Sequence, residues 1–375
     1  MEFKFGVPST IQYGRGCSKG IGAFLKELDV KNVLMVYDQG IFRAGLTGGI
    51  REGIEQAGMS VEVYDKVEPN PTDISMSEGA ALVAKAEIDA IVAIGGGSSM
   101  DCAKGIRILA SNPAPIGLYE GFEQVKHKQK ILVCVPTTSG TSSELTNVCI
   151  VSDTAQERKY IVAGKNVGAD YAFVDPNMMD GLPARVTADT GLDALTHAIE
   201  SYISLAATPL TAPLSLTAAQ LIYQNLPRAV LEKGCKEARD NMALACVIVG
   251  CAFPNAGNGL VHAISHALGA HCHLAHGTAC AVTLPYVLDF NYPCAKKQCD
   301  TLAETLAPGS GKTLREIVYD LERQIGIPTL KECGIAEERL EFLAEESMKE
   351  DFGPNPNRAI TKEAILEILK KAYHG

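Results

Sequence analysis

An excess of positive charge is missing from this 375-residue sequence. Lysine and arginine number 34 against 44 aspartates and glutamates, and the formal net charge is −10. Proteins that hold nucleic acid or anionic membranes by electrostatic attraction need basic surfaces. The charge balance therefore argues against both classes of partner and favours small molecules.

Long apolar runs and paired cysteines are also missing. No stretch gives eighteen uninterrupted apolar residues, and the first ten residues, MEFKFGVPST, contain no apolar core of a signal peptide. The twelve cysteines are scattered from Cys17 to Cys333 without a C-x-x-C pair. We therefore expect reduced thiols in a cytoplasmic protein, with most cysteines acting as small buried apolar residues.

The chain is about twice the usual length of one domain, which predicts two lobes. Up to about residue 180, short apolar runs alternate with amphipathic segments, and this alternation predicts a doubly wound α/β sheet. The predicted strands are 31–38, 60–65, 89–97, 131–138 and 171–176. Beyond Leu182 the sequence reads as successive helices, so we predict one domain over 1–182 and an all-helical one over 183–375.

Three glycines, Gly95, Gly96 and Gly97, directly follow the third predicted strand and precede a predicted helix. Glycine lets the backbone approach a ligand closely, and we expect Ser98 and Ser99 to cap a helix whose free N–H groups suit an anion. A pyrophosphate would fit here. The spacing is not the G-x-G-x-x-G fingerprint, so an ordinary strand-to-helix turn stays open as an alternative.

Polar residues also follow two other predicted strands. Thr137, Thr138 and Thr141 lie at the end of the 131–138 strand, where open α/β sheets bind ligands. Asp38 closes the first predicted strand and could accept hydrogen bonds from a ribose diol. Its carboxylate would repel a 2′-phosphate, which favours NAD over NADP, although aspartate is also a common turn residue at this place.

Histidine is concentrated in one short segment. Five of the eight histidines lie within fifteen residues: His262, His266, His271, His273 and His276. Residues four apart share a helix face, so His262 and His266 face one way, as do Asp193 and His197 in an earlier predicted helix. In one continuous helix, His262 and His276 would lie about 21 Å apart, so sharing an ion requires a break, which we predict at Gly269.

Imidazole and carboxylate donors suit Fe(II), zinc, cobalt or nickel, and the absence of a thiolate among them argues against a structural zinc site. The segment HAISH is not the H-E-x-x-H motif of metalloproteases, because it lacks the glutamate base. Spacing alone leaves open whether His262 or His266 binds the ion.

Several motifs, in one order along nearly the whole chain, resemble the iron-containing (group III) alcohol dehydrogenase family. They are GGGSSMDCAKG, PTTSGTSSE, FVDPNMM, TGLDALTHAIESYIS, and GLVHAISHALGA followed by AHGTACAVTLPYVLDFN. The resemblance implies an α/β dinucleotide-binding domain followed by an all-helical metal-binding and catalytic domain, assembled as a homodimer. It also implies hydride transfer between NAD(H) and a short-chain alcohol or aldehyde, in the cleft between the lobes. The implied metal is Fe2+, with Zn2+ as the alternative.

The same resemblance implies roles for individual residues. The implied metal ligands are Asp193, His197, His262 and His276. His266 falls near the nicotinamide, and we hypothesise that it relays the alkoxide proton to solvent. The implied dinucleotide contacts, taken together with the strand-end residues above, are Asp38, Gly95, Gly96, Gly97, Ser98, Ser99, Asp101, Thr137, Thr138, Thr141 and Lys159.

The sequence departs from the family after L-G-A, where an aromatic or apolar pair is common. This chain has His271, Cys272 and His273 there, and we expect Asn147 and Phe253 to border the same substrate pocket. One hypothesis is that His271 or His273 makes the pocket polar, to suit an aldehyde with a hydroxyl, carboxylate or sulfonate tail. The alternative is a loop histidine that faces solvent.

Three other functions stay open. A glycerol-dehydrogenase-like zinc polyol dehydrogenase has a similar layout, but that type usually lacks the histidine found at His197. A non-catalytic metal-binding protein would not need two polar loops at strand ends. A phosphosugar-binding module could use the glycines but would leave the metal residues unexplained.

Overall fold

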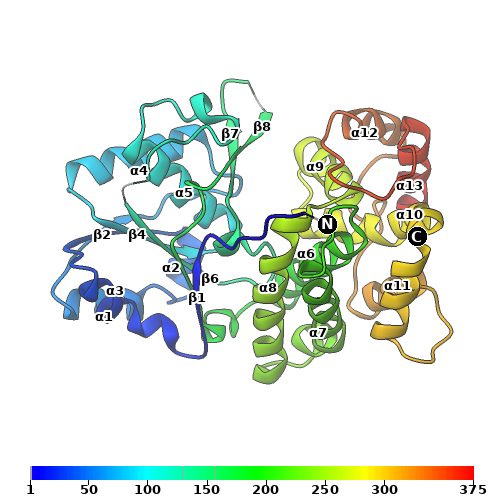
Figure 1. The fold of residues 1–375 in the computed structure, drawn as a ribbon, viewed down its shortest axis with the longest axis horizontal. Helices are drawn as coiled ribbons and strands as arrows, with labels where there is room; N and C mark the ends of the chain where they lie inside the picture. The colour runs from blue at the N-terminus through cyan, green and yellow to red at the C-terminus, as the bar shows by residue number, and fades with distance from the viewer. Residues whose placement is uncertain (1, 129, 157) are drawn as a thin grey trace. The chain divides into compact units, whose positions relative to one another are not determined.

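A six-stranded parallel sheet forms the centre of the α/β unit, Val7–Gly181 (Figure 1). The computed structural model describes residues 2–128, 130–156 and 158–375. In pairing order the strands are β1 (Thr10–Tyr13), β9 (Tyr171–Val174), β6 (Ile131–Pro136), β4 (Ala90–Gly95), β2 (Asn32–Val36) and β3 (Ser60–Tyr64), and every pair is parallel. The five strands predicted from apolar runs are confirmed, and β1 is an additional edge strand.

Helices cover both faces of this sheet (Figure 1): α1 (Ile21–Glu27), α3 (Gly48–Gln56), α4 (Asp73–Lys85) and α5 (Gly97–Ser111). Side chains of a strand alternate between the two faces. Leu34 and Val36 of β2 pack into a buried cluster with residues of α4 and α5. The neighbouring Val33 and Met35 join the opposite cluster with residues of α1 and α3. The predicted doubly wound α/β architecture is therefore confirmed.

The winding of the sheet changes direction at β2, because β3 pairs with one side of β2 and β4 with the other. In open α/β sheets, ligands bind at the carboxyl ends of the strands beside such a switch point. Asp38 follows β2, the glycines 95–97 span the end of β4 and the start of α5, and Thr137 follows β6. The parallel pairing therefore places these three groups of predicted dinucleotide residues along one edge of the sheet.

A smaller sheet of β5 (Gly121–Phe122), β8 (Arg158–Ala163) and β7 (Val148–Asp153) completes the α/β unit, together with the short helix α2 (Gln39–Arg43). Strands β7 and β8 pair antiparallel, and sequence analysis predicted neither. In β7, Cys149 and Val151 are buried whereas Ile150 between them is exposed. Burial on one face only is typical of an antiparallel sheet, whereas the central parallel strands are buried on both faces.

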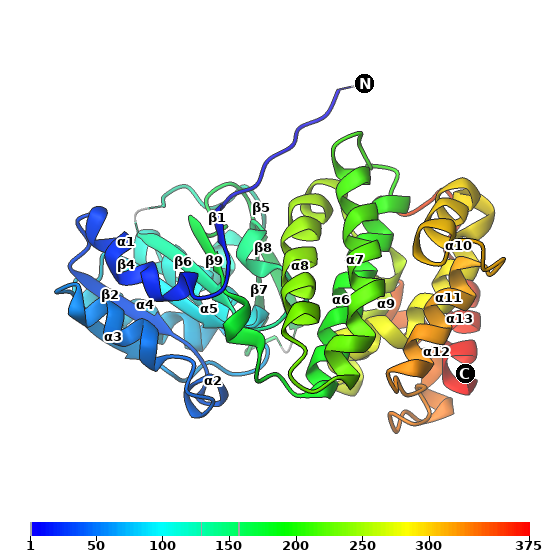
Figure 2. The same ribbon diagram turned by 90° about the horizontal axis from the view of Figure 1, so that it is seen from below.

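The helical unit comprises Leu182–Gly375 and the first residues up to Gly6. Its helices are α6 (Ala184–Ile203), α7 (Thr211–Leu231), α8 (Lys236–Ala256), α9 (Leu260–Cys272), α10 (His276–Leu306), α11 (Leu314–Gln324), α12 (Leu340–Ser347) and α13 (Lys362–His374). Figure 2 shows α6, α7 and α8 side by side, and α6 also packs against α10. No strand occurs among the described residues of this unit, as predicted.

The predicted break at Gly269 is wrong, because Gly269 lies inside α9. The helix continues to Cys272, and His273 then takes a left-handed conformation with φ of 54°. A residue in this conformation ends a helix, whereas an isolated internal glycine only weakens one, by about 1 kcal/mol. The chain then turns and α10 starts at His276, so a break between His262 and His276 exists but lies nearer to His276.

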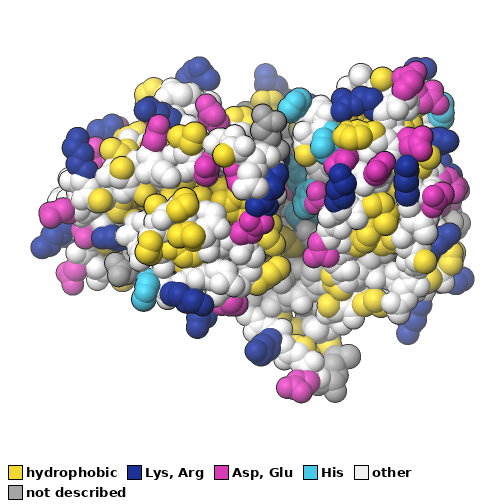
Figure 3. Space-filling model, turned by 90° about the horizontal axis from the view of Figure 1, so that it is seen from above, with side chains coloured by type: hydrophobic (Ala, Val, Ile, Leu, Met, Phe, Trp, Pro, Cys, Tyr) yellow, Lys and Arg dark blue, Asp and Glu magenta, His cyan; other side chains and the backbone are white. Residues whose placement is uncertain are grey.

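On the face drawn in Figure 3, acidic and basic side chains are interspersed over the described residues of each unit. Within the described part of the chain, no single helix is long and apolar enough to cross a membrane; only α8 and α9 taken together reach that length, and they are bent by 100°. All twelve cysteines are described, and none of them is in a disulfide.

Candidate metal centre and dinucleotide loops

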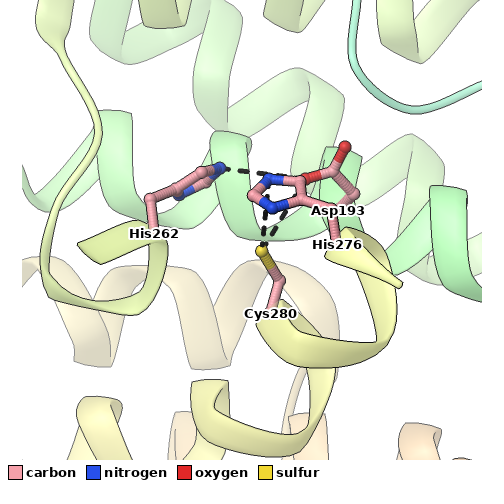
Figure 4. A group of neighbouring side chains, drawn as sticks. All are labelled: Asp193, His262, His276 and Cys280. Atoms are coloured by element: carbon pink, nitrogen blue, oxygen red, sulfur yellow. Dashed lines mark hydrogen bonds and ion pairs between the residues drawn. The ribbon is translucent and has the colours of Figure 1, made fainter. Parts of the chain in front are cut away.

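Three helices of the helical unit bring four donor side chains together (Figure 4). Asp193 comes from α6, His262 from α9, and His276 and Cys280 from α10. Their donor atoms all lie within 4.8 Å of one another. Oδ1 of Asp193 lies 3.8 Å from Nε2 of His262 and 3.5 Å from Nε2 of His276. This set, called the metal group below, has the spacing needed to share one cation.

The remaining predicted ligand, His197, lies beside the metal group. Its Nδ1 is 3.9 Å from Oδ1 of Asp193, one helical turn away on α6. Its ring centroid is 4.5 Å from that of His262. On its other side the ring stacks on Phe253 of α8 at 4.1 Å, with 20° between the planes. The four predicted metal residues are thus neighbours, and Phe253 packs directly against one of them.

Two buried imidazole nitrogens at this point have no hydrogen-bond partner among the described residues: Nδ1 of His197 and Nε2 of His262. A buried polar atom left in this state costs about 1–3 kcal/mol. Burial, followed by the nearby His262 and His276, lowers the pKa of His197 well below its ordinary value. The imidazole is therefore neutral and has a lone pair to donate, as a metal ligand requires. These residues fit a divalent ion.

The carboxyl group of Asp193 is 3% exposed, and burial raises its pKa to about 6. A cation at this point would favour the ionised form and so reverse that shift. His276, in contrast, is 40% exposed. The metal group is therefore buried at Asp193 and reaches solvent at His276.

Cys280 is a member of the metal group that sequence analysis missed. Its Sγ lies 3.8 Å from Oδ1 of Asp193 and 3.7 Å from Nε2 of His276. Burial, followed by the charge of Asp193, raises the pKa of this thiol well above its ordinary value, so it is protonated in the metal-free protein. Cys280 therefore lies beside the predicted ligands as a neutral thiol. A signal was present, because Cys280 follows His276 by four residues and shares its helix face.

His266 lies next to the metal group and is 45% exposed. Its ring is nearly parallel to that of His276, with centroids 5.6 Å apart and 24° between the planes. Its Nδ1 lies 3.2 Å from Oε2 of Glu350, which follows α12. His266 therefore touches both the metal group and solvent, and a carboxylate orients its ring.

His271 contacts a different part of the helical unit. Its Nε2 lies 3.3 Å from Oε2 of Glu346 on α12, and its ring meets Phe342 edge-on at 5.1 Å. Its backbone carbonyl accepts a hydrogen bond from Arg339. Its neighbour His273 is exposed at the end of α9. The imidazole of His271 is thus engaged by α12.

In the α/β unit, the glycine loop and the threonine loop lie against each other. The backbone N–H of Thr137 donates to the carbonyl of Gly95 at 3.0 Å. A Cβ added to Gly97 would lie 3.2 Å from Cγ2 of Thr141, and one added to Gly96 would lie 3.5 Å from Oγ1 of Thr138. The two loops therefore form one surface, called the cradle below. Because glycines 95–97 have no side chains, the backbone of this surface stays accessible.

The expected capping of α5 by Ser98 or Ser99 is wrong. The N-cap residue is Gly96, and no side chain caps this end. Both serines lie inside the first helical turn, where a side chain is past the capping position. The first N–H groups of α5 therefore have no side-chain acceptor, and the hydroxyl of Ser99 is buried without a partner among the described residues. Such a helix start suits a phosphate.

Gly95 has backbone angles that only glycine adopts readily. Its φ is +152°, and an added Cβ would lie 2.3 Å from Oγ of Ser99. Both the conformation and the close approach of the strand end to the helix require the missing side chain. Gly95 is thus the residue on which the tight geometry of this cradle depends most.

Asp101 of α5 is bound by the protein itself. Its Oδ1 accepts from Oγ of Ser143 at 2.7 Å and from Nζ of Lys104 at 3.3 Å. Its Oδ2 accepts from the backbone N–H of Ile150 at 3.2 Å. These hydrogen bonds connect α5 to the segment that follows Thr141. Asp101 therefore stabilises the arrangement of the glycine loop and the threonine loop.

The other predicted residues of the α/β unit differ in exposure, since Asp38 and Asn147 are partly buried and Lys159 is exposed. Oδ1 of Asp38 caps α2 by accepting from the backbone N–H groups of Gly40 and Ile41. Lys159 of β8 is exposed and donates to Oδ1 of Asn70 at 2.7 Å. Asn147 is partly buried and immediately precedes β7. Asp38 lies at the switch-point edge, whereas Lys159 lies in the smaller sheet.

Comparison with known proteins gives one consistent result. A family model described as "Iron-containing alcohol dehydrogenase" matches residues 8–176, and one described as "Fe-containing alcohol dehydrogenase family, C-terminal" matches residues 187–373. Alcohol dehydrogenase 4 of Saccharomyces cerevisiae (strain YJM789) is 38% identical over 374 residues, which cover 98% of each chain. NAD-dependent methanol dehydrogenase of Bacillus methanolicus is 36% identical over 98% of this chain and 99% of that protein. A crystal structure of 1,3-propanediol oxidoreductase matches with a TM-score of 0.96 at 33% identity, over 100% of both chains.

Proposed function

Because the chain belongs to the iron-containing alcohol dehydrogenase family, we propose that it transfers a hydride between NAD(H) and a short-chain alcohol or aldehyde. The observation that carries this proposal is the convergence of Asp193, His262 and His276, with unpartnered buried nitrogens on His262 and His197. A carboxylate and neutral imidazoles are ligands for a divalent metal. The geometry therefore supports a metal-dependent oxidoreductase.

The proposed metal ligands are Asp193, His197, His262 and His276, with Fe2+ as the ion and Zn2+ as the alternative. When bound, the ion would supply Lewis-acid chemistry toward the alcohol or carbonyl oxygen. Asp193 would contribute the single negative charge of the set. His276 is 40% exposed, so we propose that the substrate reaches the ion from this side.

We propose that residues 1–182 form the dinucleotide-binding domain and 183–375 the metal-binding and catalytic domain. The N–H groups at the start of α5 would bind the pyrophosphate, next to the glycines 95–97 and the threonine loop. Asp38, at the carboxyl end of β2, would accept hydrogen bonds from the adenosine ribose. The bound NAD+ supplies the hydride acceptor, and the chain's part is to hold it by backbone groups and hydroxyls.

His266 is the proposed proton carrier. It is the residue that touches both the metal group, through His276, and solvent. The Nδ1 atom of His266 contacts Glu350, so the other ring nitrogen, Nε2, would be the one that carries the proton. In alcohol oxidation His266 would accept the hydroxyl proton and release it to water, and in aldehyde reduction it would return one.

For the substrate, we propose a short aliphatic chain, with Phe253, which stacks on His197, as a pocket residue. The hypothesis of a polar or anionic tail gains no support from His271, because Glu346 and Phe342 already engage its imidazole. A panel of short aldehydes with neutral, hydroxyl, carboxylate and sulfonate tails separates the two cases. A marked preference for an anionic tail would restore the polar-pocket hypothesis.

Two rival functions are tested by the same preparation. A glycerol-dehydrogenase-like zinc enzyme would lose little metal when His197 is replaced, whereas the present proposal expects a loss. A non-catalytic metal-binding protein would leave NADH fluorescence unchanged on mixing. We also retain a homodimer and a cytoplasmic location as proposals, and light scattering of the purified protein tests the first.

The decisive experiment removes and restores the metal. The protein is stripped with a chelator, reloaded with Fe2+ or Zn2+, and assayed for NADH oxidation with short aldehydes. We expect activity to fall with the metal and return with it, while NADH fluorescence shows binding throughout. Undiminished turnover in protein shown to be free of metal would contradict the proposal.

A further inference from the structure

Glu200 lies on the same buried face of α6 as Asp193 and His197. Glu200 lies seven residues after Asp193 and three after His197, a spacing that keeps all three on one helix face. Its residue is 3% exposed. Neither the helical spacing nor the family resemblance gave Glu200 a role. A carboxylate at a buried position requires hydrogen-bond or charged partners, so its contacts indicate what it does.

The carboxylate of Glu200 accepts hydrogen bonds from three donors at the start of α9. Oε2 lies 2.6 Å from Nδ1 of His262 and 2.9 Å from the backbone nitrogen of Gly259. Oε1 lies 2.7 Å from the backbone nitrogen of Val261. A single side chain of α6 therefore holds both the first turn of α9 and the ring of His262.

The start of α9 depends on acceptors from elsewhere in the chain. Its N-cap residue is Gly259, which has no side chain to accept from the first N–H groups. Glu200 takes two of these N–H groups, and Oδ1 of Asn355 takes that of Leu260 at 3.3 Å. An added Cβ at Gly259 would lie only 2.9 Å from Oε1 of Glu200. Glycine at this position thus lets the carboxylate reach the helix end.

The contact with Nδ1 determines which nitrogen of His262 is available to a metal. A carboxylate at Nδ1 favours the tautomer with the proton on that atom, which donates to Oε2, and leaves the lone pair on Nε2. This Nε2 points toward Asp193, 3.8 Å from its Oδ1, and has no hydrogen-bond partner among the described residues. Carboxylate partners of metal-binding histidines act in this way in other proteins.

We propose that Glu200 is the positioning residue of the metal centre. Its carboxylate sets the tautomer and orientation of His262 and fixes the first turn of the helix that carries this ligand. The inference rests on the proposed function in one respect, since it takes His262 as a metal ligand. The simpler role, a helix cap that also happens to touch the ring, makes a different prediction for Asn355, which caps the same helix without contacting an imidazole.

The experiment measures metal affinity without turnover. Metal-free wild type, Glu200→Gln, Glu200→Asp and Asn355→Ala compete for Zn2+ with a chromophoric chelator, and thermal unfolding of the metal-free proteins is recorded in parallel. Glu322→Gln is the control, because Glu322 is also buried in the helical unit, at 5% exposure, and among the described residues it has no hydrogen bond or ion pair with a member of the metal group. Each variant is assayed as the full chain.

We expect Glu200→Gln to weaken zinc binding by about 10–100-fold, the usual effect of losing such a partner. An amide has one acceptor oxygen for three donors and presents its own N–H groups to the rest. Glu200→Asp keeps the charge and should recover part of the affinity. Asn355→Ala should lower the unfolding temperature by a few degrees with zinc affinity within about threefold of wild type. Glu322→Gln should leave zinc affinity unchanged.

Two outcomes would overturn the inference. Wild-type zinc affinity in folded Glu200→Gln is one, and an equal loss in Asn355→Ala and Glu200→Gln is the other, because it would reduce Glu200 to a cap. If Glu200→Gln does not fold, nitrogen NMR of histidine-labelled wild type decides: we expect His262 to carry its proton on Nδ1 at alkaline pH, and a proton on Nε2 overturns the proposal. A third outcome separates the two proposals. If zinc affinity depends on Glu200 but the protein does not oxidise NADH, only the proposed function is rejected.

Discussion

The dinucleotide cradle and the metal group are built from different parts of the polypeptide. The cradle uses backbone: the glycines 95–97, the N–H groups at the start of α5 and a close approach to the threonine loop. The metal group uses side chains from α6, α9 and α10, which are held in place by the packing of whole helices. The cradle is therefore sensitive to added bulk, and the metal group to the loss of single donor atoms.

The largest effect is expected from Asp193→Asn, which removes the one charged donor of the metal group. We expect loss of bound metal and a fall in turnover of about 10³-fold or more, since Lewis-acid stabilisation is worth several kcal/mol. Metal analysis and NADH oxidation measure both. NADH binding, followed by fluorescence, should be unchanged. A variant that lost NADH affinity as well would show that the two regions are not separable.

A smaller effect is expected from His266→Ala, which leaves every proposed metal donor in place. A general acid or base contributes about 10²–10⁴-fold, and we expect the lower end because water can reach this exposed position. Turnover should fall, the pH profile of kcat should change, and metal content should not. If turnover and pH profile both match wild type, His266 carries no proton.

Much of the fold could be predicted from the sequence because the central strands are buried on both faces. Strands such as 90–95 then read as continuous apolar runs between turn residues. The β7–β8 hairpin was not predicted although residues 148–151 and 160–163 are short apolar runs, because no helical segment separates them and the prediction depended on strands that alternate with helices. The position at which α9 ends was not predicted, because a histidine in the left-handed conformation, here His273, has no reliable sequence signal.

The metal centre was predictable only where its residues repeat at helical spacing. Asp193 and His197 satisfied that test, and the same test applied further would have found Glu200 and Cys280 on the same faces. Glu350 and Glu346 could not be found in this way, because the packing of the segment around α12 brings them to His266 and His271. Spacing reports neighbours on one helix, and the family resemblance supplied what spacing left open.

Gly95→Ala tests the cradle side of the comparison. The added Cβ would meet Ser99 at 2.3 Å, and φ of +152° is unfavourable for alanine. Strain of this kind costs about 1–3 kcal/mol. We expect NADH affinity to fall about tenfold and the unfolding temperature to drop by several degrees. Metal content should equal that of wild type. Gly234→Ala, at another positive φ but in open space far along the chain, is the matched control for strain alone.

The smallest effect concerns Asp38, which caps α2 and is proposed to bind the adenosine ribose. Asp38→Ser retains a good N-cap for α2, so the free energy of unfolding should change by less than about 0.5 kcal/mol. Removing the carboxylate should bring the affinities for NADH and NADPH about tenfold closer together, a difference near 1.4 kcal/mol. Titration of each dinucleotide by fluorescence measures the ratio. If the ratio stays at its wild-type value, Asp38 caps α2 and does nothing for the ribose, and the cradle would then recognise its ligand through backbone alone.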